Sequence, residues 1–408
     1  MSADTTRVTK RRVFHIPGYD PIHPRRYREL YRKEGAAQAQ ISGYEIALRA
    51  APSDDTFRWN VAAFIDGQLV AAQIDVLVWS DIVRESMAQS IPATYLQLIK
   101  TAWIYISSGT LRRLMWMRKG PVIAALYPVV MLLAQLAVAL GLGAIVAGLL
   151  GRVFGNGWLI WLIEWAIMLG IAVVILRWFK SIDNKLFAYY LMHDYAFSAN
   201  KAGANPAALE ERMRAFAEVI ADALQQDVDE VLIVGHSSGA HLAVSIIADL
   251  LREGRVPANG PALSFLSLGQ VVPMLSFLPK ATRLRRDLAL LASADDITWL
   301  DVSAPGDGCC FALCDPVAVS GVAPENKKWP LVISAAFTQS LTPARWKALR
   351  WRFFRLHFQY LCAFDAPKDY DYFQITAGPL TLGARYKDRQ PSGSRIDVSI
   401  SKFTDVAR

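Results

Sequence analysis

Two long apolar runs dominate the hydrophobic pattern of the chain. Residues 120–151 contain no charged side chain, and Gln135 is the only strongly polar one among them. A short glycine-rich turn follows, and a second apolar run covers 158–176 with Glu164 as its single charge. Such runs cross ~30 Å of hydrocarbon as helices, whereas buried helices of soluble proteins seldom run this long without charge. We therefore predict a transmembrane helical hairpin over 118–180.

Basic residues lie mainly outside the two apolar runs. Seven of them flank the outer ends of the hairpin, namely Arg112, Arg113, Arg118, Lys119, Arg177, Lys180 and Lys185. The connecting loop offers only Arg152. Because basic residues remain on the cytoplasmic side of a membrane, we expect an integral protein of a bacterial inner membrane. Both termini and the remainder of the chain would be cytoplasmic.

Strand and helix patterns alternate on both sides of this hairpin. Before it, we predict strands at 12–16, 44–50, 57–65 and 69–79, and helices at 24–37 and 92–117. After it, we predict strands at 230–234, 262–268 and 297–303, and helices at 206–225, 240–252 and 343–363. This alternation predicts one α/β domain with a mostly parallel sheet and helices on both faces. Its two parts are 1–117 and 181–383, and a polar tail follows at 384–408.

The motif Gly235-His236-Ser237-Ser238-Gly239 stands directly between a predicted buried strand and a predicted helix. In this context a G-x-S-x-G motif makes a sharp turn, and the glycines give the backbone the room for it. The turn lifts the serine into solvent at the carboxyl end of the sheet. The backbone N–H of Ser238, at the start of the helix, then points towards an oxyanion. A tight turn without chemistry is the alternative.

The stretch 231–244 resembles the nucleophile elbow of the α/β-hydrolase superfamily. The segment His15-Ile16-Pro17-Gly18-Tyr19 resembles the oxyanion-hole loop of lipases and esterases. A proline within that loop and a hairpin within the domain depart from the family pattern. The resemblance implies an α/β-hydrolase-like fold with Ser237 as nucleophile, and with oxyanion donors at Ser238 and at Gly18 or Tyr19. It also implies a triad in the chain order Ser, Asp or Glu, His.

The six histidines can be tested against that order. Three precede the serine, one lies inside the elbow and one lies on the helix that follows it, namely His15, His23, His193, His236 and His241. Only His357 remains as the base. Because the pattern places it in the helix predicted at 343–363, a histidine packed on an aromatic helix is the alternative.

Three aspartates are candidates for the acid that the resemblance implies. Asp307 lies in the loop just past the strand predicted at 297–303, where the superfamily places its acid, and it is favoured. Asp301 lies within that strand, and Asp315 lies farther along the chain. A role in a turn or a cap is the alternative for each of them.

Composition narrows the classes of function. The chain has 408 residues, of which 53% are hydrophobic and 20% charged, with a formal net charge of +8. The positive charge flanks apolar segments rather than forming a nucleic-acid-binding tract, so we expect a membrane and no nucleic acid as partner. The cysteines, at 309, 310, 314 and 362, form no Cys-x-x-Cys motif. We therefore expect reduced thiols, no metal and no cofactor.

These patterns together predict a membrane-anchored serine hydrolase that cleaves an acyl ester or lipid. The helix predicted at 343–363 has a basic face and an aromatic face, which suits either a membrane interface or docking on the domain. An acyltransferase or thioesterase on the same triad is the first alternative. A non-catalytic scaffold at the membrane is the second.

Overall fold

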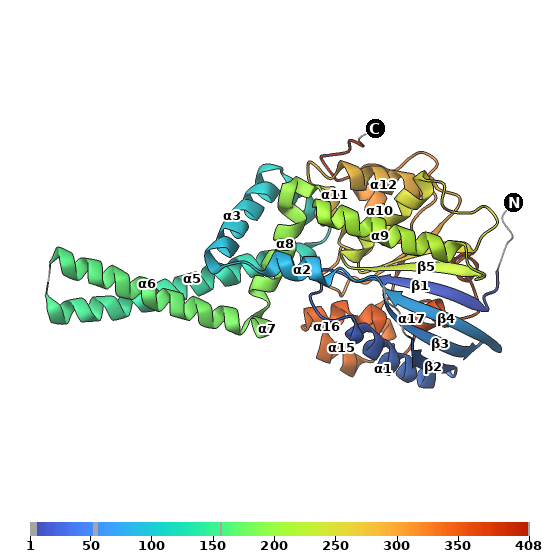
Figure 1. Ribbon diagram of the computed structural model, residues 1–408, viewed down its shortest axis with the longest axis horizontal. Helices are drawn as coiled ribbons and strands as arrows, with labels where there is room; N and C mark the ends of the chain where they lie inside the picture. Colours follow the sequence, from blue (N-terminus) through green and yellow to red (C-terminus); the bar gives the residue numbers. More distant parts are fainter. Residues whose placement is uncertain (1–5, 52–55, 156, 407–408) are drawn as a thin grey trace.

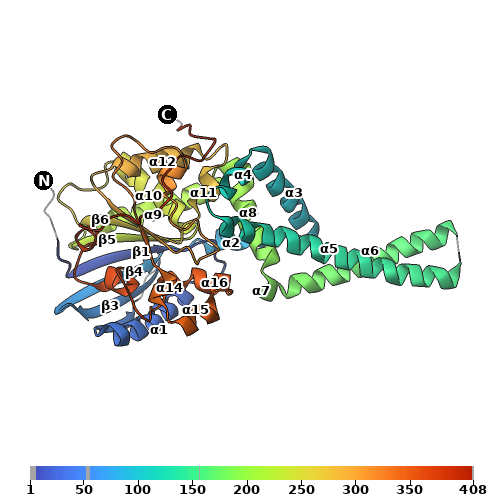
Figure 2. The same ribbon diagram turned by 180° about the vertical axis from the view of Figure 1, so that it is seen from behind.

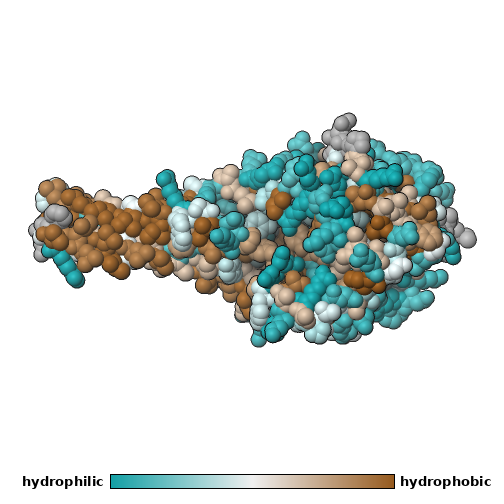
Figure 3. All heavy atoms as spheres, turned by 90° about the horizontal axis from the view of Figure 1, so that it is seen from below, coloured by the Kyte–Doolittle hydropathy of each residue, from teal (hydrophilic) through white to brown (hydrophobic). Residues whose placement is uncertain are grey.

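The computed structural model describes residues 6–51, 56–155 and 157–406. A long helical arm projects from one end of an α/β domain (Figure 1). The arm consists of α5 (Lys119–Phe154) and α6 (Trp158–Ser181), which lie side by side. Both helices are long and apolar enough to cross a membrane, as the hydrophobic pattern predicts. Figure 3 shows the arm as an almost continuous hydrophobic surface beside a mostly hydrophilic domain.

An eight-stranded sheet forms the centre of the domain, in the order β2-β3-β4-β1-β5-β6-β7-β8. Its strands are β1 (Lys10–Ile16), β2 (Glu45–Ala50), β3 (Phe57–Ile65), β4 (Gln68–Val76), β5 (Glu230–His236), β6 (Ala262–Leu268), β7 (Thr298–Ser303) and β8 (Leu331–Ser334). Only β3 runs against the others. The predicted α/β class with a mostly parallel sheet is therefore confirmed.

The buried strands contribute side chains to two hydrophobic cores, one on each face of the sheet. Along β5, Val231 and Ile233 pack into one core, whereas Leu232 and Val234 pack into the other. The first core contains residues of α9 (Ala207–Leu224), α10 (Gly239–Arg252) and α12 (Thr282–Ser293). The second contains residues of α1 (Arg25–Ser42) and α17 (Tyr372–Ala377), which lie on the opposite face of the sheet (Figure 1). Helices thus cover both faces, which explains why β5 is apolar at consecutive positions.

The order of the strands reverses between β1 and β5. From β1 the chain moves to one side of the sheet, where it forms β2, β3 and β4. It then returns past β1 and builds β5 to β8 on the other side. In open α/β sheets, ligands bind at the carboxyl ends of the strands at such a switch point. Here that place lies between the loop after β1 and the elbow after β5.

Short helices join the hairpin to this edge of the sheet. They are α2 (Ser80–Met87), α3 (Ile91–Ser107), α4 (Thr110–Met115), α7 (Asp183–Leu186) and α8 (Ala188–Ala199). Figures 1 and 2 both show α2, α7 and α8 at the base of the arm. The first turn of α5 packs against the loop after β7, because a Cβ added at Gly120 would lie 3.2 Å from the Cα of Gly308. The arm is therefore in direct contact with the edge at which the candidate site lies.

Two predicted helices are interrupted in the structure. The segment 92–117 forms α3 and α4, separated at Gly109, which has a positive φ of 75°. The prediction of one helix over 343–363 is wrong, because this segment forms α15 (Pro343–Leu349), α16 (Phe353–His357) and the short η2 (Gln359–Leu361). Leu356 and Tyr360 are buried in the core while Trp351 stays exposed. The chain therefore bends between α15 and α16, so that Leu356 and Tyr360 are buried while Trp351 is exposed. No single helix carries both the basic face and the aromatic face.

Further short elements complete the domain. They are η1 (Asn200–Gly203), α11 (Val272–Ser276), α13 (Pro316–Val319), α14 (Phe337–Ser340) and α18 (Leu382–Arg385). The polar C-terminal segment is held against the domain, since Ser392 N donates to Val332 O at 2.8 Å. Arg113, next to the hairpin, donates to Ile400 O at 2.6 Å. This segment therefore links the flank of the hairpin to the sheet.

Candidate active site

The elbow after β5 holds Ser237 in a left-handed backbone conformation, with a φ of 57°. This conformation is unfavourable for a residue other than glycine and is typical of functional sites. The Ser237 N–H donates to Leu268 O at 2.9 Å, which ties the elbow to the end of β6. A Cβ at Gly239 would lie 2.1 Å from Ile16 O, and one at Gly235 would lie 2.7 Å from the Cα of Ala240. The two glycines are thus required by close backbone contacts.

The loop after β1 lies directly against the elbow. A Cβ added at Gly18 would lie 3.0 Å from Ser237 Cβ and 3.4 Å from Ser237 Oγ. The Tyr19 N–H donates to Ser238 Oγ at 2.8 Å. This hydrogen bond occupies the Tyr19 donor, which had been one of two options for the oxyanion. Within the described residues, the N–H groups of Gly18 and Ser238 make no hydrogen bond, so they are the better pair of donors.

Asp307 and His357 form a buried hydrogen-bonded pair. The distance between His357 Nδ1 and Asp307 Oδ2 is 2.7 Å. The Tyr360 hydroxyl donates to the same oxygen at 3.0 Å, and the Cys309 N–H donates to Asp307 Oδ1 at 2.9 Å. Burial on its own would raise the pKa of Asp307, but His357 and the hydrogen bonds lower it below its ordinary value. The carboxylate is therefore ionised and fixes the Nδ1–H tautomer of His357.

His357 lies beside the elbow. Its ring centroid is 4.8 Å from that of His236, the residue before Ser237. His236 Nε2 donates to the main-chain oxygen of His357 at 2.9 Å, because a carbonyl oxygen can only accept. Burial lowers the pKa of His236 well below its ordinary value. A Cβ at Gly269 would lie 3.1 Å from His357 Cε1. The loop after β6 thus leaves room for the imidazole ring only because it has glycine at this position.

Ser237 and His357 are not joined by a hydrogen bond among the described residues. Ser237 is half-buried, and its hydroxyl makes no other hydrogen bond in this part of the chain. The Nε2 atom of His357 is likewise free of a partner, while its Nδ1 is bound to Asp307. Catalytic hydrogen bonds are often loose in a ligand-free enzyme and tighten when substrate binds. Both atoms are thus available for a reaction at the elbow.

The other candidate acids and the other candidate base have different partners. Asp301 is buried within β7 and accepts a hydrogen bond from Ser267 Oγ at 2.6 Å. Asp315 caps α13 and forms an ion pair with Lys327 at 2.7 Å. His193 Nδ1 lies 2.9 Å from Gln97 Oε1, facing α3 rather than the elbow. Of the three aspartates, Asp307 alone meets a histidine.

Asp307, Cys309 and His357 have ligand atoms within 4.8 Å of one another, which is close enough to hold a metal ion. Burial and the charge of Asp307 raise the pKa of the Cys309 thiol well above its ordinary value. A neutral thiol is a poor metal ligand. His357 Nδ1 is also engaged by Asp307. Two of these three residues are therefore already joined to each other by a hydrogen bond.

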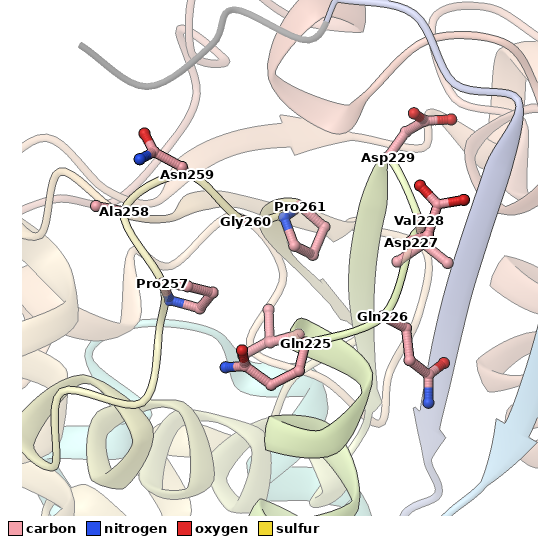
Figure 4. A pocket seen from close by; sticks show the side chains of 11 residues that line it. Gln225, Gln226, Asp227, Val228, Asp229, Pro257, Ala258, Asn259, Gly260 and Pro261 are labelled. Atoms are coloured by element: carbon pink, nitrogen blue, oxygen red, sulfur yellow. The ribbon is translucent and has the colours of Figure 1, made fainter.

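A wider cavity, of about 620 Å³, lies away from these residues (Figure 4). It is formed by the loops at 225–229 and 257–261, which precede β5 and β6. These loops lie at the amino ends of the strands, whereas Ser237 lies at the carboxyl end of β5. The large cavity is thus separated from the elbow by the length of the sheet, and it lacks a nucleophile–base pair.

Sequence reasoning missed several residues of the site. Tyr360 and His236 hold Asp307 and His357 in place, yet nothing in the pattern indicates that they meet. Asp194, on α8, acts electrostatically on His357. The adjacency of Asp194 to His193 in the sequence was the only signal for Asp194. The residues that follow strands were therefore easier to find than those on short helices.

Comparison with protein-family models, curated proteins and solved structures gave no match to this chain.

Proposed function

We propose that this chain is a membrane-anchored serine hydrolase of α/β-hydrolase-like fold that cleaves an acyl ester. The single observation that carries the proposal is the Asp307–His357 pair, with its 2.7 Å hydrogen bond, placed beside Ser237 in a left-handed elbow. The position of this group at the switch point between β1 and β5 also supports it. Serine nucleophiles are activated by such a base, which is oriented in turn by an acid.

The mechanism follows from these atoms. Ser237 Oγ attacks the carbonyl carbon of the ester while His357 Nε2 takes the hydroxyl proton. The N–H groups of Gly18 and Ser238 stabilise the oxyanion of the tetrahedral intermediate. His357 then gives its proton to the leaving alcohol, and an acyl-enzyme forms on Ser237. A water molecule, deprotonated by His357, releases the acid and regenerates the serine, and Asp307 stabilises the imidazolium in both steps.

A fluorophosphonate probe tests this proposal on the full-length protein in detergent. The expected result is covalent labelling of the wild type at Ser237 and no labelling of Ser237→Ala. Absence of labelling in the wild type would favour the non-catalytic scaffold. If labelling occurs, an added alcohol acceptor distinguishes a hydrolase from an acyltransferase, because only the transferase gives the new ester as its main product in water.

We also propose that α5 and α6 span a membrane and that the site faces its cytoplasmic leaflet. Both helices are long and apolar enough, and most of their side chains are exposed. A stripe of exposed apolar residues on α3 adjoins the base of the arm, namely Leu96, Ile99, Trp103 and Ile106. Trp116 lies under the guanidinium groups of Arg112 and Arg113, as interfacial aromatic and basic residues do. An ester with a hydrophobic acyl chain, entering from the bilayer, is therefore the favoured substrate.

Topology reporters test the orientation. A reporter inserted at Gly155, in the loop of the hairpin, is expected to be extracytoplasmic, and one fused after Arg408 cytoplasmic. The reason is the excess of basic residues at the outer ends of the hairpin. Cytoplasmic activity of the Gly155 reporter would contradict a spanning hairpin in this orientation.

A further inference from the structure

A second, small cavity adjoins the oxyanion loop. Its wall includes Tyr19, Trp79, Asp194, Phe197, Ser238 and His241. The room for the centre of a water-sized group is about 10 Å³, which corresponds to about one such group. Tyr19 and Ser238 also form the hydrogen bond that joins the loop to the elbow. The cavity is therefore next to the place where the carbonyl group of the substrate would lie.

Asp194 is the unusual member of this wall. It is half-buried, and in the described part of the chain it makes no hydrogen bond and no ion pair. The titratable groups around it are Tyr19, Tyr105, Tyr190, Tyr195, Cys309 and His357, and His241 lines the same cavity. Burial raises the pKa of Asp194 to about 7, although His357 acts in the opposite direction. A carboxylate that is partly shielded from water and has no cationic partner is unfavourable.

Three aromatic rings stand beside this carboxyl group. The ring centroids of Tyr19 and Phe197 are 5.6 Å apart, and that of Trp79 is 6.1 Å from each of them. Trp79 is held by a 2.9 Å hydrogen bond from its Nε1 to Pro17 O, and the Tyr19 hydroxyl is 2.5 Å from Ser86 Oγ. The rings are thus fixed in position, and aromatic faces attract cations. The cavity combines this attraction with one unpaired carboxylate.

We propose that this cavity is a subsite for a primary ammonium group of the substrate, with Asp194 as its counter-ion. An ammonium group is about as large as a water molecule, so it fits the room available, whereas a quaternary ammonium does not. Its three N–H donors match the carboxylate and the hydroxyl of Ser238. The location next to the elbow rests on the proposed function. The substrate is then an ester that has a primary ammonium group near the scissile carbonyl.

Ligand-induced thermal stabilisation tests the subsite without any need for turnover. The full-length protein in detergent is heated with ethylammonium chloride, with tetramethylammonium chloride or with potassium chloride at the same ionic strength, at pH 8. We expect ethylammonium alone to raise the Tm. Its Kd should be about tenfold or more weaker for Asp194→Asn, since a charge-assisted hydrogen bond is lost. Asp227→Asn, which removes a side chain with 95% relative exposure beside Lys10, is the matched control.

Equal stabilisation of the wild type and Asp194→Asn would overturn the subsite, as would a larger effect of tetramethylammonium. A second readout is protection of Ser237 from the fluorophosphonate probe. We expect ethylammonium to slow labelling of the wild type and not of Asp194→Asn. Labelling that ethylammonium never slows would contradict the subsite and leave the hydrolase proposal intact. If ethylammonium stabilises the protein through Asp194 but the probe never labels Ser237, the subsite is supported and the hydrolase proposal is contradicted.

Discussion

His357 acts to lower the pKa of both Asp307 and Asp194, but the two carboxyl groups lie in opposite surroundings. Asp307 receives hydrogen bonds from His357 Nδ1, the Tyr360 hydroxyl and the Cys309 N–H. Asp194 receives none within the described residues. Burial tends to raise the pKa of both carboxyl groups, yet the pKa of Asp307 is lowered and that of Asp194 is raised to about 7. Partners rather than depth therefore decide which carboxyl group keeps its charge.

The two groups also come from different parts of the chain. Asp307 lies in a loop after β7, where its hydrogen bonds come from the domain itself. Asp194 lies on α8, which follows the hairpin and contacts the oxyanion loop through a hydrogen bond from the Tyr190 hydroxyl to Tyr19 O. The Asp307–His357 pair thus lies on elements of the α/β domain, while the cavity beside it depends on the element that leads to the arm. We expect the first to be rigid and the second to respond to ligands and pH.

The largest effect is expected from removal of the nucleophile. Ser237→Ala should lower the rate of hydrolysis of short p-nitrophenyl esters by about 10⁴-fold or more. Ser394→Ala removes an exposed hydroxyl of the C-terminal segment and should keep the wild-type rate, so it serves as the control. Circular dichroism and Tm should stay close to wild type in both variants. Unchanged turnover in Ser237→Ala would place the chemistry elsewhere and remove the reason to compare the two carboxyl groups.

The second prediction tests the partnered carboxyl group. Asp307→Asn should lower kcat by about 10³–10⁴-fold, because an amide does not stabilise the imidazolium and disturbs the tautomer of His357. Asp301→Asn is the matched control, since Asp301 is also buried but accepts its hydrogen bond from Ser267. It should keep nearly full activity. A larger loss of kcat in Asp301→Asn than in Asp307→Asn would reverse the assignment of the acid.

Much of the surroundings of Asp307, the carboxyl group with hydrogen-bond partners, could be predicted from the sequence. Ser237 and Asp307 each lie just after an apolar strand, and the carboxyl ends of parallel strands meet at one edge. Gly18 follows β1 in the same way. His357 was predicted by elimination against the triad order that the resemblance implies, and the structure places its Nδ1 2.7 Å from Asp307 Oδ2. The hydrophobic pattern also indicated the two long helices of the arm, since their length leaves few alternatives.

The surroundings of Asp194, the carboxyl group without a hydrogen-bond partner among the described residues, could not be predicted from the sequence. α8 is apolar on most sides and has no clear period, so the sequence does not indicate that its Tyr190 and Phe197 contact Tyr19 in the loop after β1. β8 has only four residues, at the lower limit of the runs from which a strand can be predicted. The break between α15 and α16 depends on which aromatic residues the core accepts, and the hydrophobic pattern does not contain that choice. Contacts between short elements that lie far apart in the chain cannot be predicted from the hydrophobic pattern.

The third prediction concerns the way in which Asp194, the carboxyl group without a partner in the described part of the chain, makes the stability of the folded protein depend on pH. Its folded-state pKa of about 7 is raised above the ordinary Asp value, so the folded state holds the proton more tightly. The resulting stability is complete below the unfolded pKa and is lost as pH rises through 7. Asp194→Asn should therefore become more stable than wild type with rising pH, by up to about 4 kcal/mol above pH 7.

Thermal unfolding of both proteins in detergent between pH 5 and pH 8 measures this difference. Asp301 and Asp287, whose pKa values burial also raises, are present in both proteins and cancel. Asp227→Asn should follow the wild type at every pH. A Tm difference between Asp194→Asn and wild type that stays constant from pH 5 to pH 8 would show that Asp194 has a partner after all.

The smallest effect is expected from Tyr360, whose hydroxyl is one of three donors to Asp307. Tyr360→Phe leaves the bonds from His357 and Cys309, so kcat should fall only about tenfold. With less stabilisation of the carboxylate, the pKa of Asp307 should rise, and the acid limb of the pH–kcat profile should move to higher pH.

The Tyr360 hydroxyl also accepts a hydrogen bond from the Ala304 N–H at 2.9 Å, so some loss of Tm is expected in Tyr360→Phe. Tyr370→Phe, which removes a hydroxyl bonded to Tyr360 O, matches that structural loss without touching Asp307. If both variants lose Tm equally and only Tyr360→Phe shifts the acid limb, the hydroxyl acts on the charge of Asp307. An unshifted limb in Tyr360→Phe would mean that His357 and Cys309 alone set that charge.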